Sequence, residues 1–320
     1  MVIAKRRNVE QGFSLVELMI ALVLGLFIIG GVISVFIGSS RSFNSNEALS
    51  RVQENGRFAL EMIAQDLRNT GYKGSCFVNV TEVIDTADSN YEAEAYDLND
   101  PIRGWADDTG EFFAGDLTNY QAGTDILIVK HAAESAGAVL SANVDSTDTT
   151  FPTIGGETPG AIIVLSDAVG CDIFQNMAAS DTADLQRGTV GQSIDNKTVA
   201  AQALSHSYLS GGSTDVLLFS STLYYIGSGL TSSSALRSVS YDNGVANDQE
   251  LVEGVDNLAV SYALVSGAGP ALDYSNTAAQ ITVGNDWDDV VAVRVTVNVQ
   301  GDQNISHQFS TTVALRNRLQ

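Results

Sequence analysis

A single acidic side chain, Glu17, lies inside an otherwise apolar stretch near the N-terminus. The stretch runs from Phe13 to Ile37, which is 25 residues. At about 1.5 Å per residue, a helix of this length crosses a hydrocarbon layer of about 30 Å. An ionisable group in such a segment costs roughly 2.5 to 3.5 kcal/mol and usually has a functional partner. The chemistry to expect here is charge pairing within lipid.

The spacing of the sequence indicates a partner for this acid. If the chain is cut between Gly12 and Phe13, the new α-amine lies at Phe13, and Glu17 follows four residues later on the same face of a helix. The carboxylate then also lies in the first helical turn, where the helix dipole favours negative charge. The amine of a neighbouring helix is an alternative partner, and pairing between chains would set the axial register of an assembly.

Three basic residues, Lys5, Arg6 and Arg7, precede the apolar stretch. The positive-inside rule keeps them in the cytoplasm and directs the rest of the chain outward, into the periplasm. A cleaved signal peptide and a plain membrane anchor have the same basic-then-apolar order. Glu17 argues against both, because neither needs an acid within the membrane.

The segment G-F-S-L-V-E-L-M-I-A-L, from Gly12 to Leu22, closely resembles the class III prepilin signal of type IV pilins and type II secretion pseudopilins. The resemblance implies that a dedicated membrane peptidase cuts after Gly12. It also implies N-methylation of Phe13 and a role for Glu17 in filament assembly. Other pilins, the prepilin peptidase and the inner-membrane assembly platform are then the expected partners.

The composition turns amphipathic after the apolar stretch. Apolar residues recur at helical spacing from Leu49 to Leu67, with charged residues between them, and Gly71 provides a stop. We therefore expect a leader at 1–12, a transmembrane or filament-core helix at 13–38, an amphipathic continuation at 39–71 and a periplasmic β-rich domain at 72–320. The expected fold class is α+β and pilin-like, with a long N-terminal helix packed on a mostly antiparallel sheet.

Short β-rich runs bounded by Gly, Ser, Asp and Asn predict the strands of the domain. They lie at 125–130, 161–165, 216–219, 222–226, 255–264, 290–299 and 309–315. The run at 290–299 alternates apolar and polar residues from Ala292 on, as expected of a strand with one solvated face. The stretches Ala132 to Gly160 and Ser228 to Ala235 are rich in small residues and predict surface loops.

Both ends of the chain resemble the PilW group of minor pilins. The similar segments are Arg57 to Gly71, Glu250 to Leu258, the strand after Trp287 and the ending T-V-A-L-R-N-R from Thr312. The resemblance implies a low-abundance subunit without cofactors that joins other minor pilins in a complex priming pilus assembly near the tip, where a tip adhesin is a further possible partner. Motility, adhesion and DNA uptake would be supported indirectly.

The charge of the chain is concentrated in its distal part. Beyond Lys73 lie 8 basic and 32 acidic residues, a net charge of −24. Such a surface repels phosphate backbones and lacks the basic stripe that nucleic-acid binding requires. Direct DNA binding by the domain is therefore disfavoured.

Cys76 and Cys171 are the only cysteines, and both follow the membrane segment. An oxidising periplasm favours a disulfide between them, and a buried unpaired pair is the alternative.

Catalytic motifs are missing from the sequence. It contains no P-loop, no G-x-S-x-G and no H-E-x-x-H, and its three histidines, His131, His206 and His307, lack metal-ligand spacing. The chain is therefore not expected to be an enzyme. Trp105 and Trp287 fit a core better than an adhesive surface.

Oxygen-rich clusters are weak candidates for calcium, and solvated acid is the plainer interpretation. One cluster comprises Asp286, Asp288 and Asp289, and the other Asp242, Asn243 and Asp248.

Two other functions compete with the minor pilin. A type II secretion pseudopilin would use the same helix and acid, and a membrane-anchored periplasmic hydrolase or binding domain would need a concave site with perturbed acids or bases. The size of the chain and its Leu-Arg-Asn-Arg ending favour the pilus.

Overall fold

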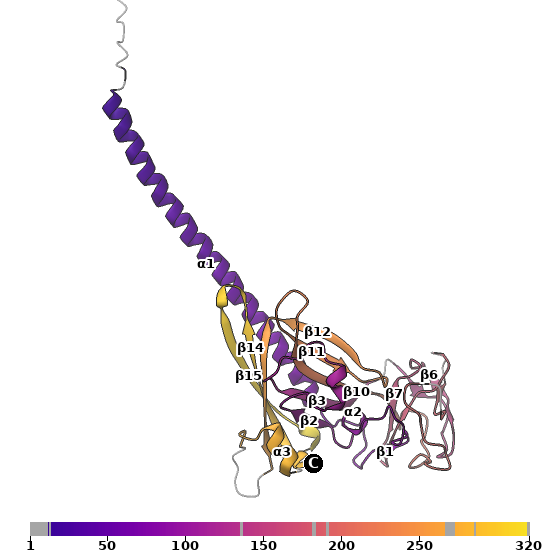
Figure 1. The fold of residues 1–320 in the computed structure, drawn as a ribbon. Coiled ribbons are helices and arrows are strands. Elements are labelled where there is room, and N and C mark those ends of the chain that lie inside the picture. The colour runs from indigo at the N-terminus through magenta and orange to yellow at the C-terminus, as the bar shows by residue number, and fades with distance from the viewer. Residues whose placement is uncertain are drawn as a thin grey trace, which may run out of the picture. The chain divides into compact units, whose positions relative to one another are not determined.

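A computed structural model describes residues 12, 14–134, 137–180, 184–189, 192–265, 273–284 and 286–318 (Figure 1). The chain divides into two compact units, residues 1–51 and residues 52–320. One long helix, α1 (Leu15–Asn69), begins in the first unit and ends in the second.

From Leu15 to Ile37, within the first unit, the apolar side chains of α1 are exposed on every side. Phe27 is 77% exposed, and Leu15, Val35 and Phe36 are each at least 70% exposed. This helix is the one among the described residues that is long and apolar enough to cross a membrane, with a mean hydropathy of 2.9 over its best window. A helix that is apolar all round requires lipid or other helices as its surroundings.

The second unit begins with the last turns of α1, which bury one face. Val52, Ala59, Ile63 and Leu67 are at most 1% exposed and recur at helical spacing. The helix ends at Asn69, and Gly71 adopts a positive φ of 73° that favours glycine. The predicted stop is thus confirmed.

The remaining elements are mostly strands. In chain order they are β1 (Thr81–Glu82), α2 (Ala93–Tyr96), β2 (Ile102–Trp105), η1 (Phe112–Gly115), β3 (Ile126–Glu134), β4 (Val139–Leu140), β5 (Thr150–Phe151), β6 (Thr153–Ile154), β7 (Ile162–Ser166), β8 (Cys171–Gln175), β9 (Leu185–Gln186), β10 (Asp215–Gly227), β11 (Ala235–Ser240), β12 (Asn247–Glu253), β13 (Val255–Leu264), α3 (Ala278–Gly284), η2 (Trp287–Asp289), β14 (Val290–Gln300), η3 (Asp302–Asn304), β15 (Ser306–Ala314) and η4 (Arg316–Arg318).

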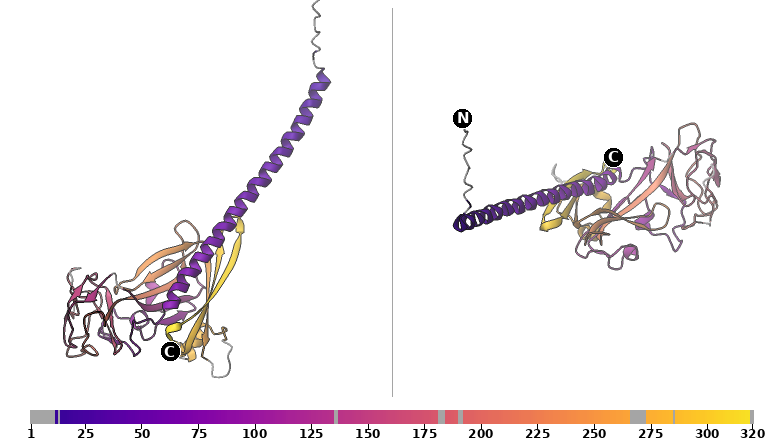
Figure 2. Two further views of the ribbon diagram at one scale, coloured as in Figure 1. Left: turned by 180° about the vertical axis from the view of Figure 1, so that it is seen from behind. Right: turned by 90° about the horizontal axis from the view of Figure 1, so that it is seen from above.

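Two sheets dominate the domain, and Figure 2 shows them from two further sides. An eight-stranded sheet has the order β1-β8-β7-β10-β11-β12, and β3 pairs with both β10 and β2. The second sheet has three strands in the order β13-β14-β15. Among the strands that the structure describes, β1 and β8 are the one parallel pair. The described residues therefore form an α+β fold with mostly antiparallel sheets, as the sequence predicts.

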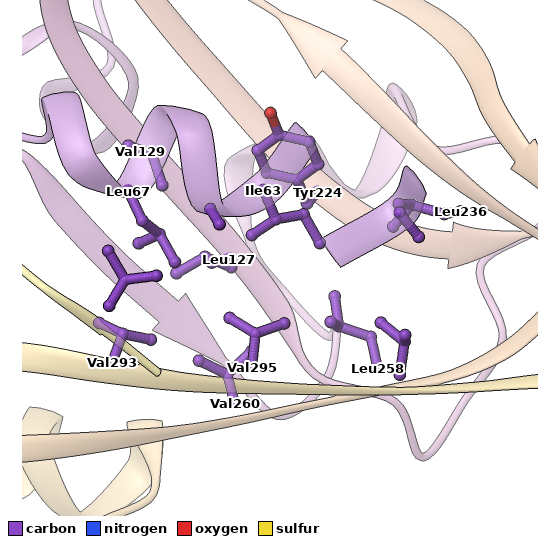
Figure 3. Close-up of a cluster of buried hydrophobic side chains, with 14 of the residues drawn as sticks. Ile63, Leu67, Leu127, Val129, Tyr224, Leu236, Leu258, Val260, Val293 and Val295 are labelled. Atoms are coloured by element: carbon purple, nitrogen blue, oxygen red, sulfur yellow. The ribbon is translucent and has the colours of Figure 1, made fainter. Parts of the chain in front are cut away.

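Three hydrophobic clusters hold these elements together. The first joins Ile63 and Leu67 of α1 to residues of both sheets, among them Leu127, Tyr224 and Val295 (Figure 3). The second covers the other face of the large sheet, because alternate residues of β3 and β10 belong to it. The third fills the space under the small strand pairs β4–β6 and β5–β9.

The strand predictions are confirmed for β3, β7, β13, β14 and β15, within a few residues at their ends. The two runs at 216–219 and 222–226 form one strand, β10, because the intervening Ser220 and Ser221 continue its pairing with β3. The expectation of a loop at 132–160 is wrong in part, since β3 extends to Glu134 and β4, β5 and β6 follow. Strands β8, β11 and β12 were not predicted, because polar residues interrupt their apolar pattern.

Gly56 allows α1 to approach β15 closely. A Cβ atom at this position would lie 2.2 Å from the ring of Phe309, a side chain of β15. Glycine normally weakens a helix interior by about 1 kcal/mol relative to alanine. Glycine is therefore required at position 56 because the Phe309 ring occupies the space that a Cβ atom would need.

We predict that Gly56→Ala destabilises the domain by about 1 to 3 kcal/mol, because overpacking outweighs the gain in helix propensity. Equilibrium denaturation of the detergent-solubilised chain measures the effect. Glu54→Ala, at an exposed position of the same helix, is the matched control and should change the stability by less than about 0.5 kcal/mol. A stabilised Gly56→Ala variant would contradict this account of the contact.

Candidate processing and assembly site

The helix α1 begins with a reciprocal capping arrangement. The backbone N–H of Glu17 donates to Ser14 Oγ at 3.1 Å, and the N–H of Ser14 donates to Glu17 Oε2 at 3.4 Å. This is the capping box of a Ser-x-x-Glu sequence, in which two otherwise unpaired N–H groups are satisfied. Ser14 is a functional neighbour that the sequence reasoning missed, although the spacing of Ser14 and Glu17 was a sufficient signal.

The capping box positions Glu17 where the sequence analysis expects it. The carboxylate lies in the first turn of α1, is exposed and is surrounded by exposed apolar side chains. Gly12 is exposed as well, and Phe13 lies outside the described residues. Cleavage after Gly12, methylation of Phe13 and the assembly role of Glu17 remain predictions.

Cys76 and Cys171 form a disulfide, as the sequence analysis expects for an oxidising compartment. The bond joins the segment after α1 to the first residue of β8, and the two Cα atoms are 5.8 Å apart. Both cysteines are buried in the second hydrophobic cluster. The bond closes a loop with a sequence separation of 95.

Buried polar groups join the end of α1 to the large sheet. Tyr224 of β10 donates its hydroxyl to Asp66 Oδ2 at 2.6 Å, and His131 Nε2 of β3 lies 3.8 Å from Asp66 Oδ1. Burial alone would lower the pKa of His131, but Asp66 and the carbonyl of Ala132 outweigh it and raise the pKa. His131 is therefore a structural residue that helps to join β3 to the end of α1.

The acids proposed as calcium ligands have other partners or lie apart. Asp248 accepts from Arg237 at 2.7 Å and from the Tyr225 hydroxyl at 2.9 Å. Burial would raise the pKa of Asp248, and the hydrogen bond from Arg237 outweighs this and lowers it. Asp242 Oδ1 accepts the backbone N–H of Ser221 instead.

The other cluster, Asp286, Asp288 and Asp289, lies in and just before η2. Within the described ranges, no group of three or more His, Cys, Asp or Glu side chains is placed to hold a metal ion. The calcium hypothesis thus gains no support. Trp287 is buried and Trp105 half-buried, so core packing accounts for both.

One group resembles a hydrolytic triad. Ser205 Oγ lies 3.0 Å from His206 Nδ1, and His206 Nε2 lies 2.9 Å from Asp167. However, the Ser205 hydroxyl donates to Asp172 at 2.7 Å, so its proton is directed away from the imidazole. A triad requires the opposite arrangement, in which the histidine accepts that proton. The geometry is that of a hydrogen-bonded polar cluster around the buried Asp172.

Two family models match the chain. The model of the prokaryotic N-terminal methylation motif matches residues 7–33, and the model of the type IV pilus-assembly protein W, PilW, matches residues 223–315. Neither the comparison with curated proteins nor that with solved structures found a match.

The first match places a pilin-type methylation motif at the start of the exposed apolar helix, and both features are consistent with membrane anchoring. The second match is to PilW, and the two together give the chain the features of a PilW-type minor pilin of a type IV pilus. The PilW match covers β11 to β15 and only the last part of β10, from Leu223 to Gly227. The matched families are those of structural pilins, which interact with other pilins and with pilus assembly machinery.

We predict that replacing Cys76 and Cys171 together by alanine destabilises the domain by at most about 4 to 5 kcal/mol, because the unfolded chain regains the entropy of a long loop. Denaturation midpoints of the oxidised wild type and the double variant measure this. Reductant should lower the midpoint of the wild type and leave that of the variant unchanged. Equal midpoints of the two proteins without reductant would contradict a structural role for the bond.

Lys130 should make the stability of the domain depend on pH. Its side chain is fully buried, and Nζ donates to the carbonyl of Glu94 at 2.7 Å. Burial lowers its pKa to about 8, despite the nearby acids. The unfolded state, with an ordinary lysine pKa of about 10.4, therefore binds more protons between about pH 8 and 10.

We predict that the free energy of unfolding gains up to about 1 kcal/mol per pH unit from Lys130 as the pH rises through this window. In Lys130→Met this contribution is absent, so the difference between wild type and variant should change with pH. Denaturation at several pH values from 7 to 10 measures it. Parallel pH profiles would contradict a lowered pKa of Lys130 in the folded domain.

Proposed function

We propose that this chain is a minor pilin that takes part in initiating type IV pilus assembly. Prepilin peptidase cuts it between Gly12 and Phe13, Phe13 is N-methylated, and Glu17 guides its α1 helix into the filament. Before assembly the chain spans the inner membrane once with its domain in the periplasm, and afterwards it lies in the pilus. Pilus-dependent motility, adhesion and DNA uptake depend on it indirectly.

The observation that carries this proposal is the position of Glu17. Within the described part of the chain, Ser14 is the one hydrogen-bonding partner of its carboxylate, at the long distance of 3.4 Å. Leader removal would create a free amine one residue before Ser14, within reach of the same carboxylate. An ion pair with that amine, or with the amine of a neighbour, is stronger in lipid than a bond to a neutral N–H.

The exposed apolar helix supports the same conclusion. Leu15 to Ile37 offers side chains that lipid covers before assembly and that other helices cover afterwards. Lys5, Arg6 and Arg7 favour a periplasmic domain. The PilW match favours a pilus subunit over a secretion pseudopilin, which would share the N-terminal motif alone.

Two variants in the native host test the proposal, each replacing the chromosomal copy. Glu17→Ala should reduce surface pili by tenfold or more while leaving cleavage intact. The variant leaves the partner amine without its carboxylate, and an unpaired charge in the membrane costs roughly 2.5 to 3.5 kcal/mol. Glu47→Ala, which removes an exposed acid further along α1, is the matched control and should assemble normally. Electron microscopy counts the pili, and mass spectrometry identifies the mature N-terminus.

Normal piliation in the Glu17→Ala strain would contradict the assembly role. A wild-type chain that retains Lys5, Arg6 and Arg7 would contradict the processing.

A further inference from the structure

The last strand of the domain, β15, has one open edge. In the three-stranded sheet it pairs with β14 from Ser306 to Ala314 without a register shift. At the ends of this ladder, the N–H of Leu315 donates to Val291 and the carbonyl of Ile305 accepts from Gly301. Because antiparallel residues alternate in direction, the odd-numbered residues bond to β14 and the even-numbered ones direct their N–H and C=O groups outward.

No described residue bonds to these outward backbone groups. The residues concerned are Ser306, Gln308, Ser310, Thr312 and Ala314, and their side chains are all exposed. β15 is the end strand of its sheet, and Figure 1 labels no strand beyond it. The strand thus presents a row of free donors and acceptors nine residues long.

The opposite edge of the same sheet is closed. On β13, the carbonyl of Leu258 accepts from the N–H of Asp125, and the N–H of Val260 donates to the Asp125 carboxylate. The N–H of Tyr262 donates to the carbonyl of Asn276. Three outward groups at the centre of this edge, the Leu258 carbonyl and the N–H groups of Val260 and Tyr262, are therefore already bonded, and the segments of Asp125 and Asn276 occupy the edge.

The edges of the large sheet are protected in other ways. β12 carries Asp248, Glu250 and Glu253, and charged side chains on an edge oppose pairing. β1 and β2 are only 2 and 4 residues long. By contrast, β15 has neither a charged residue nor proline nor a bulge. Proteins generally block such edges, so an unblocked one requires an explanation.

The charge around β15 also differs from that of the domain. The outward faces of β14 and β15 carry Ser, Thr, Asn, Gln and Ala side chains, and Arg294 is the one ionised group on them. The chain as a whole has a net charge of −22. An acidic neighbour would be repelled elsewhere and can approach at this edge without repulsion.

We infer that the open edge of β15 binds an exposed strand of a neighbouring pilin-type subunit by β-strand addition. The inference rests on the proposed function. Phe309 of β15 packs against Gly56 of α1, so β15 runs beside the helix along which a neighbouring pilin would dock. Main-chain hydrogen bonds would provide the affinity, and the small hydroxyl side chains would leave room for the incoming strand.

A second copy of this chain is a poorer occupant. Antiparallel pairing of β15 with the β15 of another copy requires a two-fold axis perpendicular to the strands, which reverses the direction of the second chain. Subunits whose helices all point the same way in a filament are not related by such an axis. An antiparallel partner must therefore present a different edge strand.

A photo-crosslinker at Gln308 in the full chain, expressed in the native host, tests the inference. We expect an adduct in which the attached residue lies in a strand of another chain that carries a prepilin-type N-terminus. Ser310→Pro removes an outward N–H but none that bonds to β14, and should lower the adduct yield by about tenfold. Ser310→Ala, which loses the same hydroxyl but keeps the N–H, should leave the yield unchanged.

Thr312→Asp provides a second test that contains no proline. It places a carboxylate on the acid-free edge and should lower the yield similarly. A crosslinker at Gln249 on β12 is the position control and should give no pilin adduct. The amount of oxidised Cys76–Cys171 chain verifies that each variant folds.

Three results would overturn the inference: equal yields from Ser310→Pro and Ser310→Ala, an adduct with a second copy, or an adduct with a protein that lacks the prepilin motif. Cleavage and piliation, measured in the same strains, separate the two proposals. A processed, Glu17-dependent pilus without the Gln308 adduct refutes the strand addition alone.

Discussion

The fold depends on one constraint, which is that a single helix of 55 residues must have its apolar surface covered in two different media. From Leu15 to Ile37 the apolar residues lie on all sides, so only lipid or other helices can cover them. From Val52 the apolar residues narrow to one face, which the two sheets cover. The sequence changes its periodicity between these parts without breaking the helix.

The two sheets are arranged so that they cover the apolar face of α1 from Val52 to Leu67. Two sheets contribute to one cluster with Ile63 and Leu67, so the helix serves as part of the core and not as an attachment to it. Gly56 lets Phe309 approach the helix, and Asp66 binds Tyr224 at its last turns. Loss of the helix would expose apolar residues of both sheets to water, so removal of α1 up to Asn69 would destabilise the domain.

The sequence predicted the features that depend on local pattern. Glu17 within an apolar stretch, the stop at Gly71 and the alternation of β14 all follow from periodicity and charge. It did not predict β8, whose Cys171-Asp172 start is polar, because burial of Asp172 depends on hydrogen bonds from the distant Ser205 and Tyr208. Nor could it predict the space for Phe309 at Gly56, since that contact joins residues 253 positions apart. The Ser-x-x-Glu spacing of Ser14 and Glu17 is sufficient to predict the capping box.

The two edges of the three-stranded sheet differ in how they are covered. The three-stranded sheet has two edge strands, β13 and β15, and the residues that the structure describes cover only one of them. Asp125 and Asn276 occupy the edge of β13, whereas the edge of β15 has no bonded partner in the described part of the chain. An isolated acidic domain would gain nothing from this asymmetry, because an open neutral edge invites aggregation. In the proposed pilus subunit, a strand of a neighbouring chain would complete the sheet at this edge, and the proposed strand addition thereby gives the open edge a function.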